Sequence, residues 1–253
     1  METELSGLRI HYRDQAVYFI PGGYYCEIDE KDISIDADGA PNAYGPQKGP
    51  DDHAGCGIDS LVNADYPPGQ ADPLGQEDWK TILVPDPNDP AVPYCKPDGF
   101  FISRTSLCDE TKSDLEPGKY LDATAVSYIV APSFWLDQLG LQLGDLCLLS
   151  HTGIGRTVVA IVGDACPVTE PLGEISVRCA VDLGGKNVSP ITGVDFPPGG
   201  KVQCAMLKGS RPDSIWPADD ARLQALLPSL LQERLGSQPI AQIQALIIKN
   251  DDP

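Results

Sequence analysis

The chain has 253 residues, enough for one large domain or two small ones to bury a hydrophobic core. It carries 18 Lys and Arg residues against 37 Asp and Glu residues, and the resulting net charge of −19 disfavours nucleic acid and anionic membranes as partners. Its longest uninterrupted apolar run, residues 158–162, is far shorter than the roughly 20 residues of a membrane-spanning helix. The composition therefore predicts a folded acidic protein whose partners are cationic or neutral and polar.

The N-terminal residues and the cysteines favour different cellular compartments. Glu2 and Glu4 stand where a signal peptide has Lys or Arg, and no apolar stretch follows, so no signal peptide is predicted. The even number of cysteines, 8, favours disulfides and an oxidising compartment. We expect a secreted or exported protein. Three routes stay open: a mature form that has lost its leader, a leaderless effector, or a cytosolic protein with buried thiols.

Metal ligation is not favoured by the spacing of the cysteines and histidines. No two cysteines are separated by only two residues, and none of the 3 histidines is spaced at i, i+4 from another. The sequence therefore predicts neither a metal nor another cofactor.

Short apolar or alternating segments, bounded by Gly, Pro, Asp or Asn, recur along the chain and predict strands. They are residues 16–20, 33–35, 81–84, 100–102, 125–130, 146–149, 158–162, 175–181, 202–207 and 246–248. Residues 66–97 are rich in proline and predict a long ordered loop. A helical leucine repeat is found at residues 219–235, and Pro228 should kink or split this helix, which we expect to pack against the sheet.

These elements predict a mainly β protein. We expect a single domain over residues 1–253 that forms a β-barrel, with a double-psi arrangement as one option, and a C-terminal amphipathic helix. The catalytic core should span about residues 20–210, and the helical appendage about residues 218–236.

Two carboxylates flank a predicted turn in residues 157–180. Asp164 ends an apolar run, and alternation in the following strand places Glu174, Ser176 and Arg178 on one face. If the two strands pair as a hairpin, Asp164 and Glu174 stand at the same open end, at a separation compatible with the ~6.5–9.5 Å of inverting glycoside hydrolases. The pattern alone is more typical of turn residues that cap a hairpin.

Three blocks of sequence carry a more specific signal. They are Ile-Asp-Ala-Asp-Gly-Ala-Pro-Asn-Ala-Tyr at residues 35–44, Gly-Ile-Asp-Ser-Leu-Val-Asn-Ala at residues 57–64, and residues 163–167 together with Gly-Glu-Ile-Ser at residues 173–176. Together with residues 99–107 they resemble family 75 of the glycoside hydrolases, the fungal-type chitosanases. In that family an Asp after Gly and a Glu after Gly are catalytic, which implies these roles for Asp164 and Glu174. The sequence departs from the family pattern at Asp65, Cys166 and Ile175, so the polymer that is cleaved stays open.

Substrate-binding roles are expected for residues near these blocks. The resemblance implies that Asp36 and Asp38 line the cleft and bind a sugar amine or hydroxyl, although a structural turn explains them equally well. A calcium loop is disfavoured, because counting from Ser34 places Gly45 where an EF-hand loop has Glu. Tyr44, Trp79 and Ser176 complete the predicted substrate-binding set; the two aromatic residues lie in loop-rich sequence, where their rings can stack on sugars, with core packing as the alternative.

The leading functional hypothesis is an inverting endo-hydrolase of β-1,4-linked glucosamine polymers such as chitosan. Desolvation favours a protonated carboxyl, so Asp164, at the end of an apolar run, is expected to be the acid and Glu174 the base. The first alternative is a leaderless antibacterial effector that hydrolyses peptidoglycan glycan strands and has an immunity protein as partner. The second is a catalytically inactive carbohydrate-binding protein.

Overall fold

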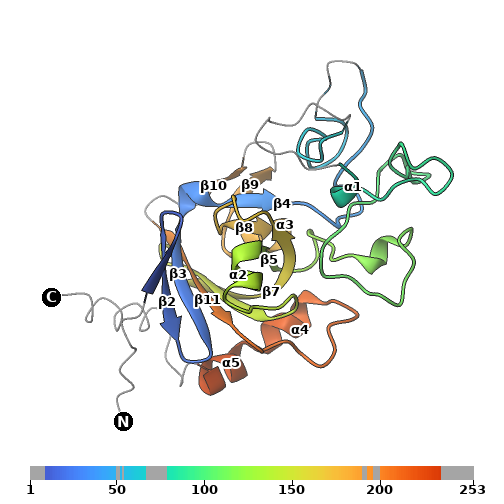
Figure 1. Cartoon of the computed structure of the whole chain (residues 1–253). Helices are drawn as coiled ribbons and strands as arrows, with labels where there is room; N and C mark the ends of the chain where they lie inside the picture. The colour runs from blue at the N-terminus through green and yellow to red at the C-terminus, as the bar shows by residue number, and fades with distance from the viewer. Residues whose placement is uncertain are drawn as a thin grey trace, which may run out of the picture.

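A nine-stranded sheet that curls into a half-barrel dominates the computed structural model, which describes residues 9–49, 52, 54–66, 79–189, 193–195 and 200–234 (Figure 1). The strands follow the spatial order β1-β2-β3-β11-β6-β7-β5-β8-β4. Their bounds are β1 (Arg9–Tyr12), β2 (Gln15–Ile20), β3 (Gly23–Asp29), β4 (Ser34–Asp36), β5 (Tyr128–Pro132), β6 (Leu146–His151), β7 (Arg156–Cys166), β8 (Glu174–Ser176) and β11 (Lys201–Leu207). The prediction of a mainly β, barrel-like fold with a short C-terminal helix is confirmed.

The remaining elements are short. A second sheet pairs β9 (Lys186–Ser189) with β10 (Gly193–Asp195). The helices are α1 (Trp79–Ile82), α2 (Ser133–Asp137), α3 (Val177–Asp182), α4 (Asp220–Ala225) and α5 (Leu227–Arg234), with 3-10 turns at Glu30–Asp32 and Pro117–Lys119. Among the helices described, none is long and apolar enough to cross a membrane.

The central strands are apolar on both faces because both faces of the sheet are covered. Along β6, Leu148 belongs to one apolar cluster, whereas its neighbours Cys147 and Leu149 belong to another. The same alternation occurs along β7, where Val159 and Val158 enter different clusters. Strands buried on two sides are near-continuous apolar runs, which is why their sequence was recognisable.

The expected hairpin between the two carboxylate-bearing strands is wrong. β5 lies between β7 and β8, running parallel to β7 and antiparallel to β8. β8 also pairs in parallel with β4, so segments distant in sequence form this edge of the sheet. The chain between Asp164 and Glu174 therefore passes around β5 instead of turning directly back.

Three predicted strands are corrected in part or in full, and of these residues 100–102 make only an isolated bridge, between Phe101 and Cys95. The segment 175–181 leaves the sheet after Ser176, because the Ser176 hydroxyl accepts a hydrogen bond from the N–H of Cys179 and caps α3. Residues 81–84 begin as part of α1, and Leu83 makes only an isolated bridge to Ser103. The predicted strand at residues 246–248 lies outside the described residues.

Pro228 divides the C-terminal helix as expected. α4 ends at Ala225, and α5 accommodates Pro228 as its second residue, where the missing N–H has no helical partner to lose. Leu223 and Leu230 are buried in the main apolar cluster, which confirms that the helix packs against the sheet.

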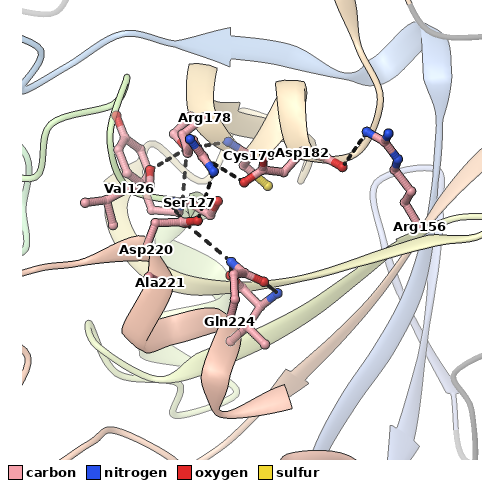
Figure 2. A network of polar contacts seen from close by, with 12 residues as sticks. Val126, Ser127, Arg156, Arg178, Cys179, Asp182, Asp220, Ala221 and Gln224 are labelled. Atoms are coloured by element: carbon pink, nitrogen blue, oxygen red, sulfur yellow. Dashed lines mark hydrogen bonds and ion pairs between the residues drawn. The ribbon is translucent and has the colours of Figure 1, made fainter. Parts of the chain in front are cut away.

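A partly buried polar network fastens α4 to the sheet (Figure 2). The Asp220 carboxylate accepts a hydrogen bond from the Ser127 N–H at 2.9 Å and forms an ion pair with Arg178 at 3.5 Å. The Gln224 side chain both donates to and accepts from the backbone of Val159 on β7. The network thus joins α4, α3 and the central strands through paired groups.

Candidate active site

A polar cavity of about 510 Å³ opens where β4, β7 and β8 meet the loops that precede and follow α1. Five carboxyl side chains line it, from Asp36, Asp38, Asp59, Asp164 and Glu174. Arg104 is the single basic residue of this lining. The cavity therefore has a strong excess of potential negative charge and is suited to a cationic ligand.

The strands determine how Asp164 and Glu174 face each other. Glu174 begins β8, and Asp164 lies near the end of β7, opposite Val130 of the intervening β5. Two strand spacings correspond to about 9–10 Å between the backbones that carry these side chains. A single intervening strand thus gives a separation comparable to the ~6.5–9.5 Å between carboxyl groups in inverting glycosidases.

Asp164 is held by donors on one oxygen. Its Oδ1 accepts hydrogen bonds from the Ser106 N–H at 2.9 Å, the Ser106 hydroxyl at 2.5 Å and the Ala165 N–H at 2.7 Å. Hydrogen bonds to a carboxylate stabilise its charged form and fix its orientation. The carboxyl of Asp164, which is only 8% exposed, is therefore held in a fixed orientation.

Asp36 lies in a very different environment. It is 6% exposed, and burial raises the pKa of its carboxyl well above the ordinary value, with further contributions from the charges of Glu174 and Asp164. The N–H of Asp38 donates to Asp36 Oδ1 at 2.6 Å and opposes this shift. Burial, followed by the charge of Asp36, likewise raises the pKa of Asp38. These carboxyls retain protons more readily than free aspartates.

One group of residues has the geometry to hold a metal ion. Carboxylate oxygens of Asp36, Asp38 and Asp164 lie within 4.8 Å of one another, and no other such group occurs in the described part of the chain. Oxygen ligands of this kind suit hard cations such as Ca²⁺ or Mg²⁺. Protons relieve the same repulsion, as the raised pKa values of Asp36 and Asp38 indicate.

Five of the seven predicted site residues come together in the cavity: Asp36, Asp38, Tyr44, Asp164 and Glu174. The Tyr44 hydroxyl donates to Asp59 Oδ2 at 3.0 Å, and the ring is nearly buried, so little of it is free to stack on a sugar. The sequence prediction thus located the acidic centre of this cavity.

The other two predicted substrate-binding residues, Ser176 and Trp79, lie in the core and outside the cavity lining. Ser176 is fully buried, and its hydroxyl donates to the Val126 carbonyl while accepting from two backbone N–H groups. Trp79 packs edge-on against Tyr66, with ring centroids 5.6 Å apart. The Ser176 hydroxyl forms hydrogen bonds with backbone groups, and the Trp79 ring packs in the apolar core.

Several lining residues were not predicted. Asp59 and Asn63 lie within the second sequence block, and their side chains hydrogen-bond to each other at 2.8 Å. Burial raises the pKa of Asp59, although the hydrogen bonds from Asn63, Ser60 and Tyr44 oppose the shift. Ser106, which holds Asp164, is distant in sequence, and no local spacing pattern connects the two residues.

Comparisons with known proteins add no assignment, because no family model matches the sequence and a search of curated proteins finds no match. The resemblance to family 75 therefore remains an expectation from the sequence.

Proposed function

We propose that the chain is an inverting endo-glycoside hydrolase that cleaves β-1,4-linked glucosamine polymers such as chitosan. One observation carries the proposal: Asp164 and Glu174 line the same polar cavity from two strands that are separated by a single strand. Inversion needs one carboxyl on each side of the anomeric carbon, with room for a water molecule beside the base.

The contacts of Asp164 support an assignment of acid and base that reverses the one expected from sequence. The three donors on Asp164 favour its ionised form, so we assign it as the base that activates water. Glu174, the less buried carboxyl of the pair, is then the acid that donates a proton to the leaving oxygen.

The charge of the cavity supports a cationic polymer. Asp36, Asp38 and Asp59 add three carboxyls around the proposed catalytic pair, against the single guanidinium of Arg104. Protonated sugar amines complement such a surface, whereas the acidic peptide stems of peptidoglycan are repelled. Because such a polymer lies outside the producing cell, the proposal includes secretion or export of the protein.

The test is incubation of the protein with chitosan and, separately, with purified peptidoglycan, followed by measurement of new reducing ends. Asp164→Asn and Glu174→Gln should each lower the rate on chitosan by about 10²–10⁴-fold, because each removes one proton-transfer group. Asp137→Asn, on the exposed end of α2, is the matched control and should retain full activity.

Each of the other results leads to a different conclusion. Cleavage of peptidoglycan alone would identify the effector alternative, for which an immunity protein is the expected partner. Binding of chitosan without cleavage would indicate an inactive binding protein. Near-full activity of either folded variant would show that the assigned catalytic pair is wrong. The anomer released first, seen by NMR, should be α if the mechanism is inverting.

A further inference from the structure

Four fully buried cysteines belong to one apolar cluster, outside the proposed active site. They are Cys26 on β3, Cys147 on β6, Cys179 on α3 and Cys204 on β11. All four are free thiols in this structure, and the Cys204 thiol interacts with the thiols of both Cys26 and Cys147. Cys26 and Cys147 are thus both candidates for a disulfide with the Cys204 sulfur.

The strand register distinguishes between these two neighbours. Cys26 stands directly opposite Cys204 in the antiparallel pair of β3 and β11. Directly opposite residues in such a pair have Cα atoms about 4.5–5.5 Å apart. A disulfide spans Cα separations of about 4.4–6.8 Å, so this pair is within bonding geometry.

Cys147 has a less favourable position. On the β6–β11 pair, Cys147 lies opposite Met206, whereas Cys204 lies opposite Leu149. Cys147 and Cys204 are therefore diagonal neighbours, with Cα atoms about 7–8 Å apart. That separation is at or beyond the limit of about 7 Å for a disulfide without movement of the backbone.

We propose that Cys26 and Cys204 form a disulfide that links β3 to β11, while Cys147 and Cys179 remain thiols. The oxidant is a disulfide, either a small molecule or one carried by an oxidoreductase. One cysteine thiolate attacks the oxidant and releases its first thiol, and the second cysteine then attacks the mixed disulfide and releases the second thiol. Two protein thiols and one disulfide thus give one protein disulfide and two free thiols.

The burial of the pair determines when this reaction takes place. The hydrogen bond with Cys204, together with burial, raises the pKa of the Cys26 thiol. Since the thiolate is the reacting species, exchange in the folded protein is slow. The bond therefore forms before β11 closes on β3, and afterwards the apolar cluster shields it from reductants.

The direct test uses the wild-type chain, folded with glutathione disulfide and then denatured in an alkylating reagent without reductant. Peptide mass spectrometry should find the peptides of Cys26 and Cys204 joined, with Cys147 and Cys179 alkylated. Full alkylation of Cys26 and Cys204 would overturn the proposal, and so would a link from Cys204 to Cys147.

A second measurement compares Cys26→Ala with Cys147→Ala, which remove the same group from the same buried cluster. In oxidised protein, Cys26→Ala should lower the Tm by about 5–15 °C more than Cys147→Ala, because only the former removes a cross-link. After folding with reductant the difference should vanish. Equal losses in the oxidised protein would contradict the cross-link. Both measurements are independent of the proposed hydrolase activity.

Discussion

Asp36 and Asp220 are buried to nearly the same extent but have opposite surroundings. Asp220 has the guanidinium of Arg178, the N–H of Ser127 and the amide of Gln224 within reach (Figure 2). The charged neighbours of Asp36 are other carboxylates, and its hydrogen bonds come from neutral groups, the N–H of Asp38 and the side chain of Tyr128. A buried charge is tolerated where partners replace the lost water, and it is unfavourable where they do not.

This difference in partners distinguishes Asp220, whose carboxyl stabilises the fold, from the cavity carboxyls, which form the candidate site. The partners of Asp220 are groups of the protein itself, so its interactions are complete in the folded chain. Asp36 and Asp38 are instead surrounded by carboxylates that repel their charges, and a ligand that brings positive charge relieves this repulsion. This contrast predicts effects of opposite sign when each aspartate is changed.

The largest expected effect on stability is that of Asp220→Ala. The substitution leaves the Ser127 N–H without its acceptor and separates α4 from Arg178, so it should lower the free energy of unfolding by about 2–4 kcal/mol. Asp182→Ala is the matched control, because Asp182 also pairs with Arg178 but is more exposed, and its loss should cost about 1 kcal/mol or less. Urea unfolding measures both, and equal losses would contradict the role of burial.

Asp36→Asn should act in the opposite direction. It removes a poorly compensated buried carboxyl and keeps an oxygen for the Asp38 N–H, so it should stabilise the protein by about 1–2 kcal/mol at pH 7. On chitosan, KM should rise with kcat largely retained, as for a residue that binds substrate. A destabilised variant would show that Asp36 is compensated by interactions that the cavity geometry does not indicate.

The dependence of stability on pH is a further test of the contrast between Asp36 and Asp220. Because folding raises the pKa values of Asp36, Asp38 and Asp59, the stabilisation from their protonated forms is fully present below pH ~4 and is lost as the pH rises through the folded-state values. The advantage of Asp36→Asn over the wild type should therefore grow by about 1 kcal/mol between pH 4 and pH 7. An advantage that stays constant with pH would exclude titration of Asp36 as its cause.

The smallest expected effect is that of salt. If the acidic cavity and surface attract a polycationic substrate, KM for chitosan should rise a few-fold between low salt and about 0.5 M salt, because screening acts over roughly 10 Å or less. Initial rates at several salt concentrations measure this effect, with Asp137→Asn as a variant that should follow the wild type. A KM that does not change with salt would contradict electrostatic capture of the polymer.

The local sequence predicted those elements whose structure depends mainly on their own residues. The apolar runs at 158–162 and 202–207 became β7 and β11, and Pro228 divided the C-terminal helix as expected. Strand pairing was not predictable in this way, because nothing in the pattern of β7 and β8 indicates that β5 inserts between them. Ser176 lies in a strand-like stretch of sequence, yet its hydroxyl caps helix α3. The local sequence is compatible with both structures, because a serine hydroxyl can bond to nearby backbone groups and so compete with strand pairing.

The residues of the candidate site were also predictable only in part. Acidic residues in the blocks that resemble family 75 were found together in the cavity, with Asp36 and Asp164 contributed by strands far apart in sequence. Trp79 was predicted to face a ligand because its neighbourhood is loop-rich, but large aromatic rings gain more from burial than from exposure. The hydrogen bonds from Ser106 to Asp164 depend on tertiary packing alone.

The position of β5 between β7 and β8 also makes the connecting loop a site for variation. Because the width of β5 sets the spacing of Asp164 and Glu174, the length of residues 167–173 does not. This loop is held along its length, because the Tyr12 hydroxyl donates to the carbonyls of Val168 and Glu170 and Gln15 pairs with the backbone of Leu172. New residues inserted in this loop would alter the surface beside the cavity while leaving the two carboxyls in register, so the loop is a place where the ligand preference of the cavity can change without a change in the sheet.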